Sequence, residues 1–101
     1  LDPQKGEKVV YKHRYSGFYN TDLETTLRCL KIEDLVVTGI MTNLCVESTV
    51  RDAFFRDYRV ITLLDATGSI NEDLHLSTLK NLAFGFSFIT TTDKMVESLK
   101  G

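Results

Sequence analysis

The sequence predicts an α/β fold in which a mainly parallel sheet lies between two layers of helices. Short β-rich segments alternate with amphipathic segments along the 101 residues, and this order requires crossover connections between parallel strands. The segment 34–39 is nearly continuous in apolar residues, as in strands that are buried on both faces of a parallel sheet. No repeat, low-complexity tract or linker interrupts the pattern. We therefore expect a single domain that comprises residues 1–101.

Two strands and two helices are expected in the first half of the chain. The β-rich segment 8–11 predicts the first strand. In the helix that follows, Thr21 and Glu24 have the spacing of a capping box. The apolar stripe of this helix consists of Leu23, Leu27 and Leu30. After the strand at 34–39, a second helix is expected from about 43 to 56. Its apolar face consists of Val46, Val50, Ala53 and Phe54.

The same alternation continues in the second half. The expected elements are a strand at 58–64, a helix near 71–84, a strand at 87–90 and a helix near 92–100. In the last helix, Asp93 in the first turn and Lys100 in the last turn complement the helix dipole. Active sites of open parallel sheets lie at the carboxyl ends of the strands. We therefore expect functional residues in the loops that follow these strands.

Composition and charge exclude several classes of protein. The net charge of −2 and the pI of about 5.6 argue against a nucleic-acid partner, which requires a basic face. No apolar run approaches the ~20 residues that cross a bilayer, and the polar N-terminus does not have the pattern of a signal peptide. Two cysteines are too few for a disulfide scaffold, so the cytoplasm is the expected compartment. No set of His, Cys, Asp and Glu has metal-ligand spacing, and neither a metal nor another cofactor is expected.

Cys45 is the first candidate for chemistry. A buried strand is expected to end at Gly39 and a helix to begin near Asn43, which puts Cys45 in the first turn of that helix. Free backbone N–H groups and the positive end of the dipole favour a thiolate there, and the same N–H groups could stabilise an oxyanion. The alternative is that Cys45 is a buried cysteine that only fills space.

Lys12 is the second candidate, because it follows the strand expected at 8–11 and lies at the same edge of the sheet. A lysine beside a thiol would stabilise the thiolate and could carry a proton to a leaving amine. A solvated loop lysine is the alternative. A pair of Cys45 with His13 remains possible, although His13 points the opposite way if the strand persists. His75 is expected on a helix surface, and Cys29 is expected to be structural or merely exposed.

These residues lie in segments that resemble the isochorismatase-like family of cysteine hydrolases. The block Gly39-Ile40-Met41-Thr42-Asn43-Leu44-Cys45-Val46 carries the most specific part of the resemblance. Other matching segments are 9–18, Thr21 with Leu23, 35–38, 47–49, 51–53, 58–60 and 65–66. Within the family, Tyr15 and the Ser16-Gly17-Phe18 stretch are most similar to ureidoacrylate amidohydrolases; nicotinamidase and N-carbamoylsarcosine amidohydrolase are more distant.

The resemblance implies a Rossmann-like α/β/α domain with a catalytic triad of Asp, Lys and Cys, in which Lys12 and Cys45 match two members. It also implies a cis peptide between Ile40 and Met41, with the N–H groups of Met41 and Cys45 forming an oxyanion hole. Tyr15 and Phe18 are expected to line the substrate pocket. Isochorismatase itself cleaves an enol ether without this cysteine, so Cys45 favours hydrolysis of a C–N bond in a small amide or ureido compound.

The sequence departs from the family at its start. None of its aspartates lies in the family's aspartate motif, and the chain begins with Leu, just before the lysine segment. We therefore expect about half of the family domain, incomplete as an enzyme by itself, that forms a homo-oligomer or a complex with the missing N-terminal half. The alternatives are a non-catalytic fragment or assembly subunit, or a thiol redox protein. The redox reading is the weakest because Cys29 and Cys45 do not form a Cys-x-x-Cys motif.

Overall fold

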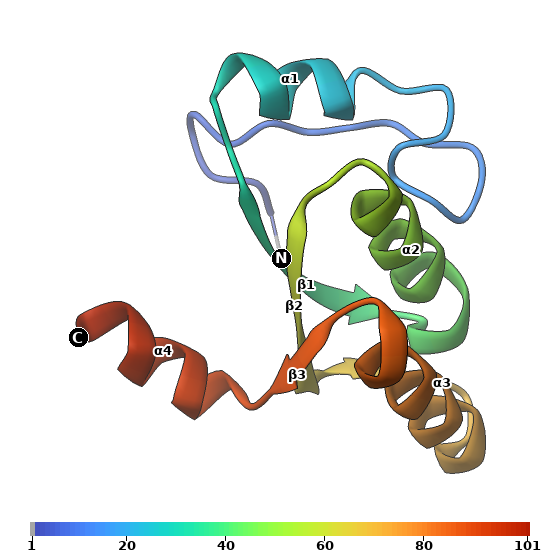
Figure 1. Cartoon of the computed structure of the whole chain (residues 1–101). Coiled ribbons are helices and arrows are strands. Elements are labelled where there is room, and N and C mark those ends of the chain that lie inside the picture. The colour runs from blue at the N-terminus through green and yellow to red at the C-terminus, as the bar shows by residue number, and fades with distance from the viewer. Residues whose placement is uncertain (1) are drawn as a thin grey trace.

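The computed structural model describes residues 2–101; Leu1, the first residue of the expected domain, lies outside them. Within residues 2–101, four α-helices alternate with a sheet of three strands (Figure 1). A π-helical turn, η1, precedes the second helix. The elements are α1 (Leu23–Cys29), β1 (Asp34–Ile40), η1 (Thr42–Val46), α2 (Glu47–Phe55), β2 (Arg59–Gly68), α3 (Glu72–Gly85), β3 (Phe88–Thr90) and α4 (Thr92–Lys100).

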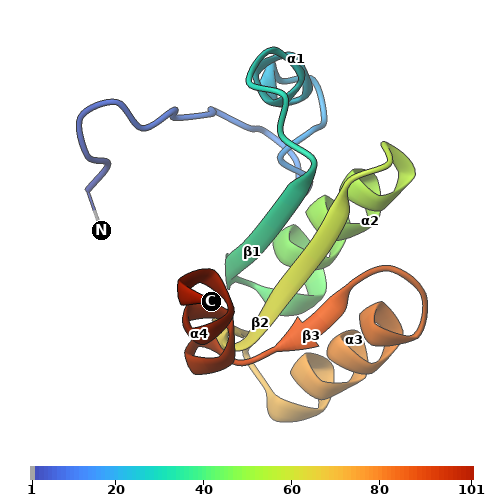
Figure 2. The same ribbon diagram turned by 60° about the vertical axis from the view of Figure 1, so that its left-hand side comes forward.

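The sheet is parallel throughout and has the strand order β1-β2-β3. Leu35 is paired with Val60, and Ile61 is paired with Phe88. The register of β1 shifts between Val37 and Gly39, where Gly39 has a φ of 116°, a conformation that other residues rarely adopt. Figure 2 shows α2 and α3 on one side of the sheet and α4 on the other. This arrangement is the three-layer α/β/α fold that the alternation of segments predicted.

The core lies between the sheet and the helix pair α2 and α3. Its buried cluster consists of Phe18, Val46, Val50, Ala53, Tyr58, Val60 and Leu82. Three of the four residues expected on the apolar face of the second helix are in this cluster, whereas Phe54 is exposed. None of the helices in residues 2–101 combines the length and the apolar character that a membrane span requires.

The strand expected at 8–11 does not form. These residues have no regular structure, and the side chains of Val9 and Tyr11 are 43% and 83% exposed. The side chain of Lys8 instead pairs with Asp22, with 2.7 Å between Nζ and Oδ2. A strand is stabilised by hydrogen bonds to a neighbouring strand. A β-rich segment of four residues that lies beside no such neighbour therefore does not form a strand.

The apolar sequence of β1 predicted a strand that is buried on both faces, but the structure does not show this. Its burial alternates: Leu35 and Val37 are partly buried against the core, whereas Val36 and Ile40 are exposed. The cause is the uneven covering of the sheet, since α2 and α3 fill one face and α4 packs mainly against β2 on the other. The exposed apolar residues of β1 therefore lie on the uncovered face and at the edge of the sheet.

The capping box expected at Thr21 and Glu24 is also wrong. The N-cap of α1 is Asp22, without a side-chain cap, and Glu24 forms ion pairs with Arg28 and Arg56. The hydroxyl of Thr21 accepts a hydrogen bond from the Leu23 N–H at 3.3 Å and donates one to the Gly17 carbonyl at 2.6 Å. Leu30 follows the helix and is exposed, so the apolar stripe of α1 is reduced to Leu23 and Leu27.

Candidate functional site

Cys45 lies in the turn that joins β1 to α2. The helix expected over 43–56 consists of two parts, the π-helical turn η1 and the α-helix α2. The carbonyl of Met41 accepts hydrogen bonds from the N–H groups of Leu44 and Val46, at 3.1 and 3.2 Å, and these bonds close the turn around the cysteine. Cys45 is partly buried, whereas its neighbour Val46 belongs to the core. The thiol is therefore fixed at the carboxyl end of β1 and remains accessible.

The peptide bond between Ile40 and Met41 is cis, at the position where the family resemblance implies one. This bond lies between the last residue of β1 and the first residue of the cysteine turn. Met41 is partly buried and Ile40 is exposed.

Lys12 meets Cys45 although 33 residues separate them in the sequence. Its ammonium donates to the sulfur of Cys45 at 3.2 Å and to the Arg14 carbonyl at 3.1 Å. The thiol and the ammonium are thus in direct contact. The two residues that the sequence selected are thus brought together as a pair. Within residues 2–101, the recorded hydrogen bonds and ion pairs of this pair include none to a carboxylate.

The segment that carries Lys12 is attached to α2 by the residues that follow it. The Gly17 N–H donates to the Thr49 hydroxyl at 2.9 Å, and Thr49 is one turn along from Cys45. The Phe18 N–H donates to the Ser16 hydroxyl at 3.1 Å, and the Phe18 ring is inserted into the core. These contacts fix the chain five residues after Lys12 against the helix that follows Cys45.

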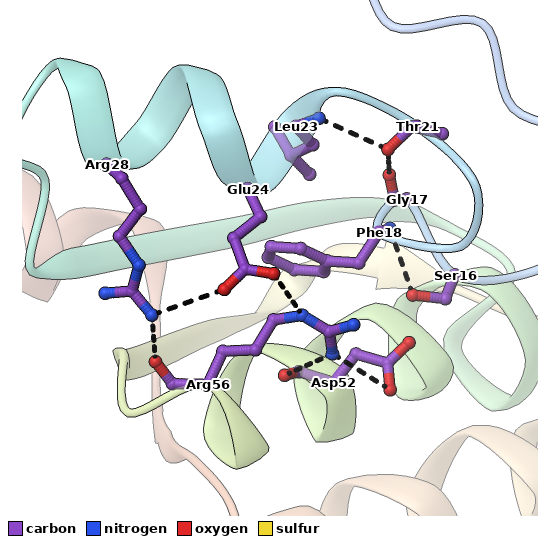
Figure 3. Close-up of polar contacts among 9 residues, drawn as sticks. All are labelled: Ser16, Gly17, Phe18, Thr21, Leu23, Glu24, Arg28, Asp52 and Arg56. Atoms are coloured by element: carbon purple, nitrogen blue, oxygen red, sulfur yellow. Dashed lines mark hydrogen bonds and ion pairs between the residues drawn. The ribbon is translucent and has the colours of Figure 1, made fainter.

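A second set of contacts, at the other end of α2, attaches α1. The side chain of Arg56 extends from the end of α2 to Glu24 on α1, with 3.0 Å between Nε and Oε1 (Figure 3). Arg28 pairs with the same carboxylate and also donates to the Arg56 carbonyl. Arg56 lies over the Phe18 ring, 5.0 Å from its centroid, and Arg28 lies over Tyr58. The network thus links α1 to both α2 and the buried aromatic pair.

The two aromatic residues expected in the pocket wall have different positions. Tyr15 is 56% exposed and lines an open cavity of about 500 Å³ together with Lys12, His13 and Arg14. Phe18 is only 5% exposed and stacks on Tyr58, with ring centroids 6.2 Å apart. Phe18 is therefore a core residue that supports the lysine segment, whereas the side chain of Tyr15 is exposed.

Among the other candidates, Cys29 is exposed and His13 lines the open cavity beside Lys12. Both cysteines are free thiols. Within the described residues, the recorded bond to the Cys45 sulfur comes from Lys12 and not from His13. The geometry favours the Cys-Lys pair over the Cys-His pair.

His75 does not lie on a helix surface as expected. It is partly buried, and its Nδ1 is 2.7 Å from the Thr42 hydroxyl, at the start of the cysteine turn. The sequence contained a signal for this position, because His75 precedes the buried Leu79 and Leu82 by four and seven residues on α3.

Asp65 has a structural role in the carboxyl half of β2. Its carboxylate accepts hydrogen bonds from the hydroxyl and the N–H of Thr92, both at 2.8 Å, at the start of α4. These bonds, that of the Thr92 hydroxyl first, hold the pKa of Asp65 below its usual range. The residue matches the family pattern and attaches α4 to the sheet.

Comparison with known proteins identifies one family. The family model described as the isochorismatase domain matches residues 1–94. The chain is 44% identical over 95 residues to "Nicotinamidase 3" of Arabidopsis thaliana. The matched region covers 94% of this chain and 48% of that protein. It is 50% identical over 91 residues to "Ureidoacrylate amidohydrolase RutB" of Methylobacterium radiotolerans, with coverages of 89% and 35%.

Solved structures agree with this assignment. An isochorismatase-like hydrolase from Alkaliphilus metalliredigens superposes with a TM-score of 0.95 at 41% identity and covers 98% of this chain and 55% of that one. A cysteine hydrolase from Pseudomonas syringae also gives a TM-score of 0.95, at 35% identity, with coverages of 99% and 52%. The chain spans less than half of these two curated relatives and about half of these two solved chains.

Proposed function

The chain belongs to the isochorismatase family, and on that premise we propose that it carries the nucleophile and the lysine of a cysteine amidohydrolase. The contact of 3.2 Å between the Lys12 ammonium and the Cys45 sulfur is the observation that supports this most directly. A nucleophile beside a cation at the end of a parallel strand is an arrangement that acyl transfer requires. The relatives named as amidohydrolases support hydrolysis of an amide bond.

In the proposed reaction, the Cys45 thiolate attacks the carbonyl carbon of the substrate, and a C–S bond forms. The N–H groups of Met41 and Cys45 stabilise the resulting oxyanion. When the tetrahedral intermediate collapses, the C–N bond breaks and Lys12 assists proton transfer to the departing ammonia. Water then attacks the thioester, releases the acid and restores the thiol. In this proposal, the carboxylate that accepts the thiol proton comes from outside this chain.

The proposed substrates are small amides or ureido compounds. Nicotinamide-like amides and ureido acids are both suggested by the names of the relatives. Tyr15, on the wall of the open cavity beside Lys12, is the residue of this chain that we expect to contact the rest of the substrate. No residue of the chain is proposed to hold a metal or another cofactor.

The uncovered face of the sheet supports a proposal about partners. Val36 and Ile40 of β1 and Phe88 of β3 are exposed apolar residues. An exposed strand edge beside such residues favours pairing with further chain. We propose that the remaining half of the family domain covers this surface, and that the complete protein forms a homo-oligomer. Two free thiols are compatible with the cytoplasm, the compartment that we propose.

The test is an assay of ammonia release from a panel of ureido acids and primary amides. The full-length protein is compared with Cys45→Ala and with Cys29→Ala, which removes the exposed thiol on α1. We expect Cys29→Ala to retain activity and Cys45→Ala to lose it on every substrate. Release that survives Cys45→Ala would contradict the mechanism. No release from the intact protein would favour the non-catalytic alternative.

A further inference from the structure

A partly buried hydrogen bond connects the cysteine turn to α3. Thr42, the first residue of η1, is completely buried, and its hydroxyl is 2.7 Å from Nδ1 of His75. The two residues are 33 positions apart, so the bond joins separate elements rather than successive turns of one helix. A buried hydroxyl requires a partner, because an unsatisfied one loses its hydration without compensation. His75 supplies that partner.

A second hydrogen bond holds the next residue of the turn. The Ser69 hydroxyl, in the connection between β2 and α3, donates to the side-chain oxygen of Asn43. Thr42 and Asn43 are thus attached at two points to the segment 69–75. Both residues lie between Met41, the proposed oxyanion donor, and Cys45, the proposed nucleophile. Rotation of this turn would move both groups relative to the Lys12 ammonium.

We propose that His75 is a positioning residue, which fixes the orientation of the cysteine turn through Thr42. It does not touch the reacting atoms; its ring acts on them through the Thr42 hydroxyl. This inference rests on the proposed function, because the turn matters only if Met41 and Cys45 act on a substrate. Sub-ångström placement of reacting groups strongly affects rate, and a misplacement of ~1 Å can cost on the order of a hundredfold.

The same face of α3 supplies a matched control. The hydroxyl of Thr78, one turn after His75, donates to Oε1 of Glu47 on α2 at 3.1 Å. Thr78 is also buried, and its bond likewise joins α3 to the neighbouring helix. Its partner Glu47 is the first residue of α2 and follows the last residue of the cysteine turn, Val46. Thr78→Val therefore removes a partly buried hydrogen bond of similar kind without releasing Thr42.

The first readout is steady-state kinetics of the full-length protein. His75→Leu and Thr42→Val are expected to lower kcat by about ten- to a hundredfold with little change in KM. His75→Asn and Thr42→Ser, which retain a hydrogen-bonding group, should recover part of this loss. Thr78→Val should retain the kcat of the wild type even where its thermal stability falls. Equal losses of kcat in His75→Leu and Thr78→Val would overturn the proposal.

The second readout does not depend on turnover. The rate of alkylation by iodoacetamide is measured by peptide mass spectrometry at Cys45, with the exposed Cys29 as the internal reference. In His75→Leu we expect the alkylation rate of Cys45 to fall several-fold relative to that of Cys29, because rotation of the turn would move the Cys45 sulfur away from the Lys12 ammonium. In Thr78→Val this ratio should not change. A Cys45 rate that is unchanged or faster in His75→Leu overturns the positioning role, even if the intact protein hydrolyses no substrate on the panel.

Discussion

The two halves of the candidate site are held in different ways. Cys45 lies in a turn between β1 and α2, and the residues beside it, Thr42 and Val46, are buried. Lys12 lies in a segment without regular structure, next to the exposed Tyr11. The position of the nucleophile is therefore fixed by the core, whereas the position of the lysine depends on a few contacts that follow it in the chain. Changes on the lysine side should affect activity more than stability.

The largest effect is expected from removing the lysine itself. Lys12→Met retains the aliphatic length and removes the ammonium that contacts Cys45. Positioned proton-transfer groups contribute typically ~10²–10⁴-fold, so kcat/KM should fall by about a hundredfold or more. Thermal unfolding should be unchanged, because the side chain is exposed.

The control for this prediction is Lys5→Met, in the same exposed segment. It alters the net charge equally but leaves the contact between Lys12 and Cys45 intact. A comparable loss of activity in both variants would mean that general charge, and not the contact with Cys45, accounts for the effect.

An intermediate effect is expected from loosening the attachment of the lysine segment. Thr49→Val removes the acceptor of the Gly17 N–H and leaves the shape of α2 nearly unchanged. A lost hydrogen bond of this kind costs about 1 kcal/mol of unfolding free energy, and kcat/KM should fall by less than in Lys12→Met. Denaturant unfolding and kinetics of the same samples measure the two quantities. Ser48→Ala, which removes the hydroxyl of the preceding residue on α2, is the control. If Thr49→Val matched it in both quantities, the attachment would be of no consequence.

The smallest effect is expected outside the Cys45–Lys12 pair, at the contact between β2 and α4. The pKa of Asp65 in the folded protein is lowered by the Thr92 hydroxyl and N–H, so the ionised carboxylate favours folding. This contribution is complete above the unfolded pKa of about 3.9 and is lost as the pH falls through the lower folded value. Thermal unfolding of wild type and Asp65→Ala should differ by a constant amount at neutral pH and converge below about pH 4. A difference independent of pH would contradict the assignment.

The contrast between the cysteine side, which is held by the core, and the lysine side, which has no regular structure, also explains which elements the sequence predicted. The strands at 34–39 and 58–64 and the helices α3 and α4 were predicted because short apolar runs alternate with amphipathic segments, a local pattern that the sequence shows directly. The predicted strand at 8–11 failed because a short β-rich segment forms a strand only beside a neighbour, which local sequence does not reveal. Burial of Phe18 and the bond from His75 to Thr42 depend on contacts between distant segments. The Cys-Lys pair followed from the family resemblance more than from any local pattern.

The most direct test of the account is to trap the acyl-enzyme. The full-length protein is mixed with an amide substrate from the panel, quenched in acid within the first turnovers, and digested for mass spectrometry. We predict a mass increase equal to the substrate minus ammonia on the peptide that contains Cys45, and none on the peptide that contains Cys29. The slower Lys12→Met variant is quenched and digested in the same way. Turnover by the wild type, with no adduct on Cys45 in either protein, would contradict Cys45 as the nucleophile.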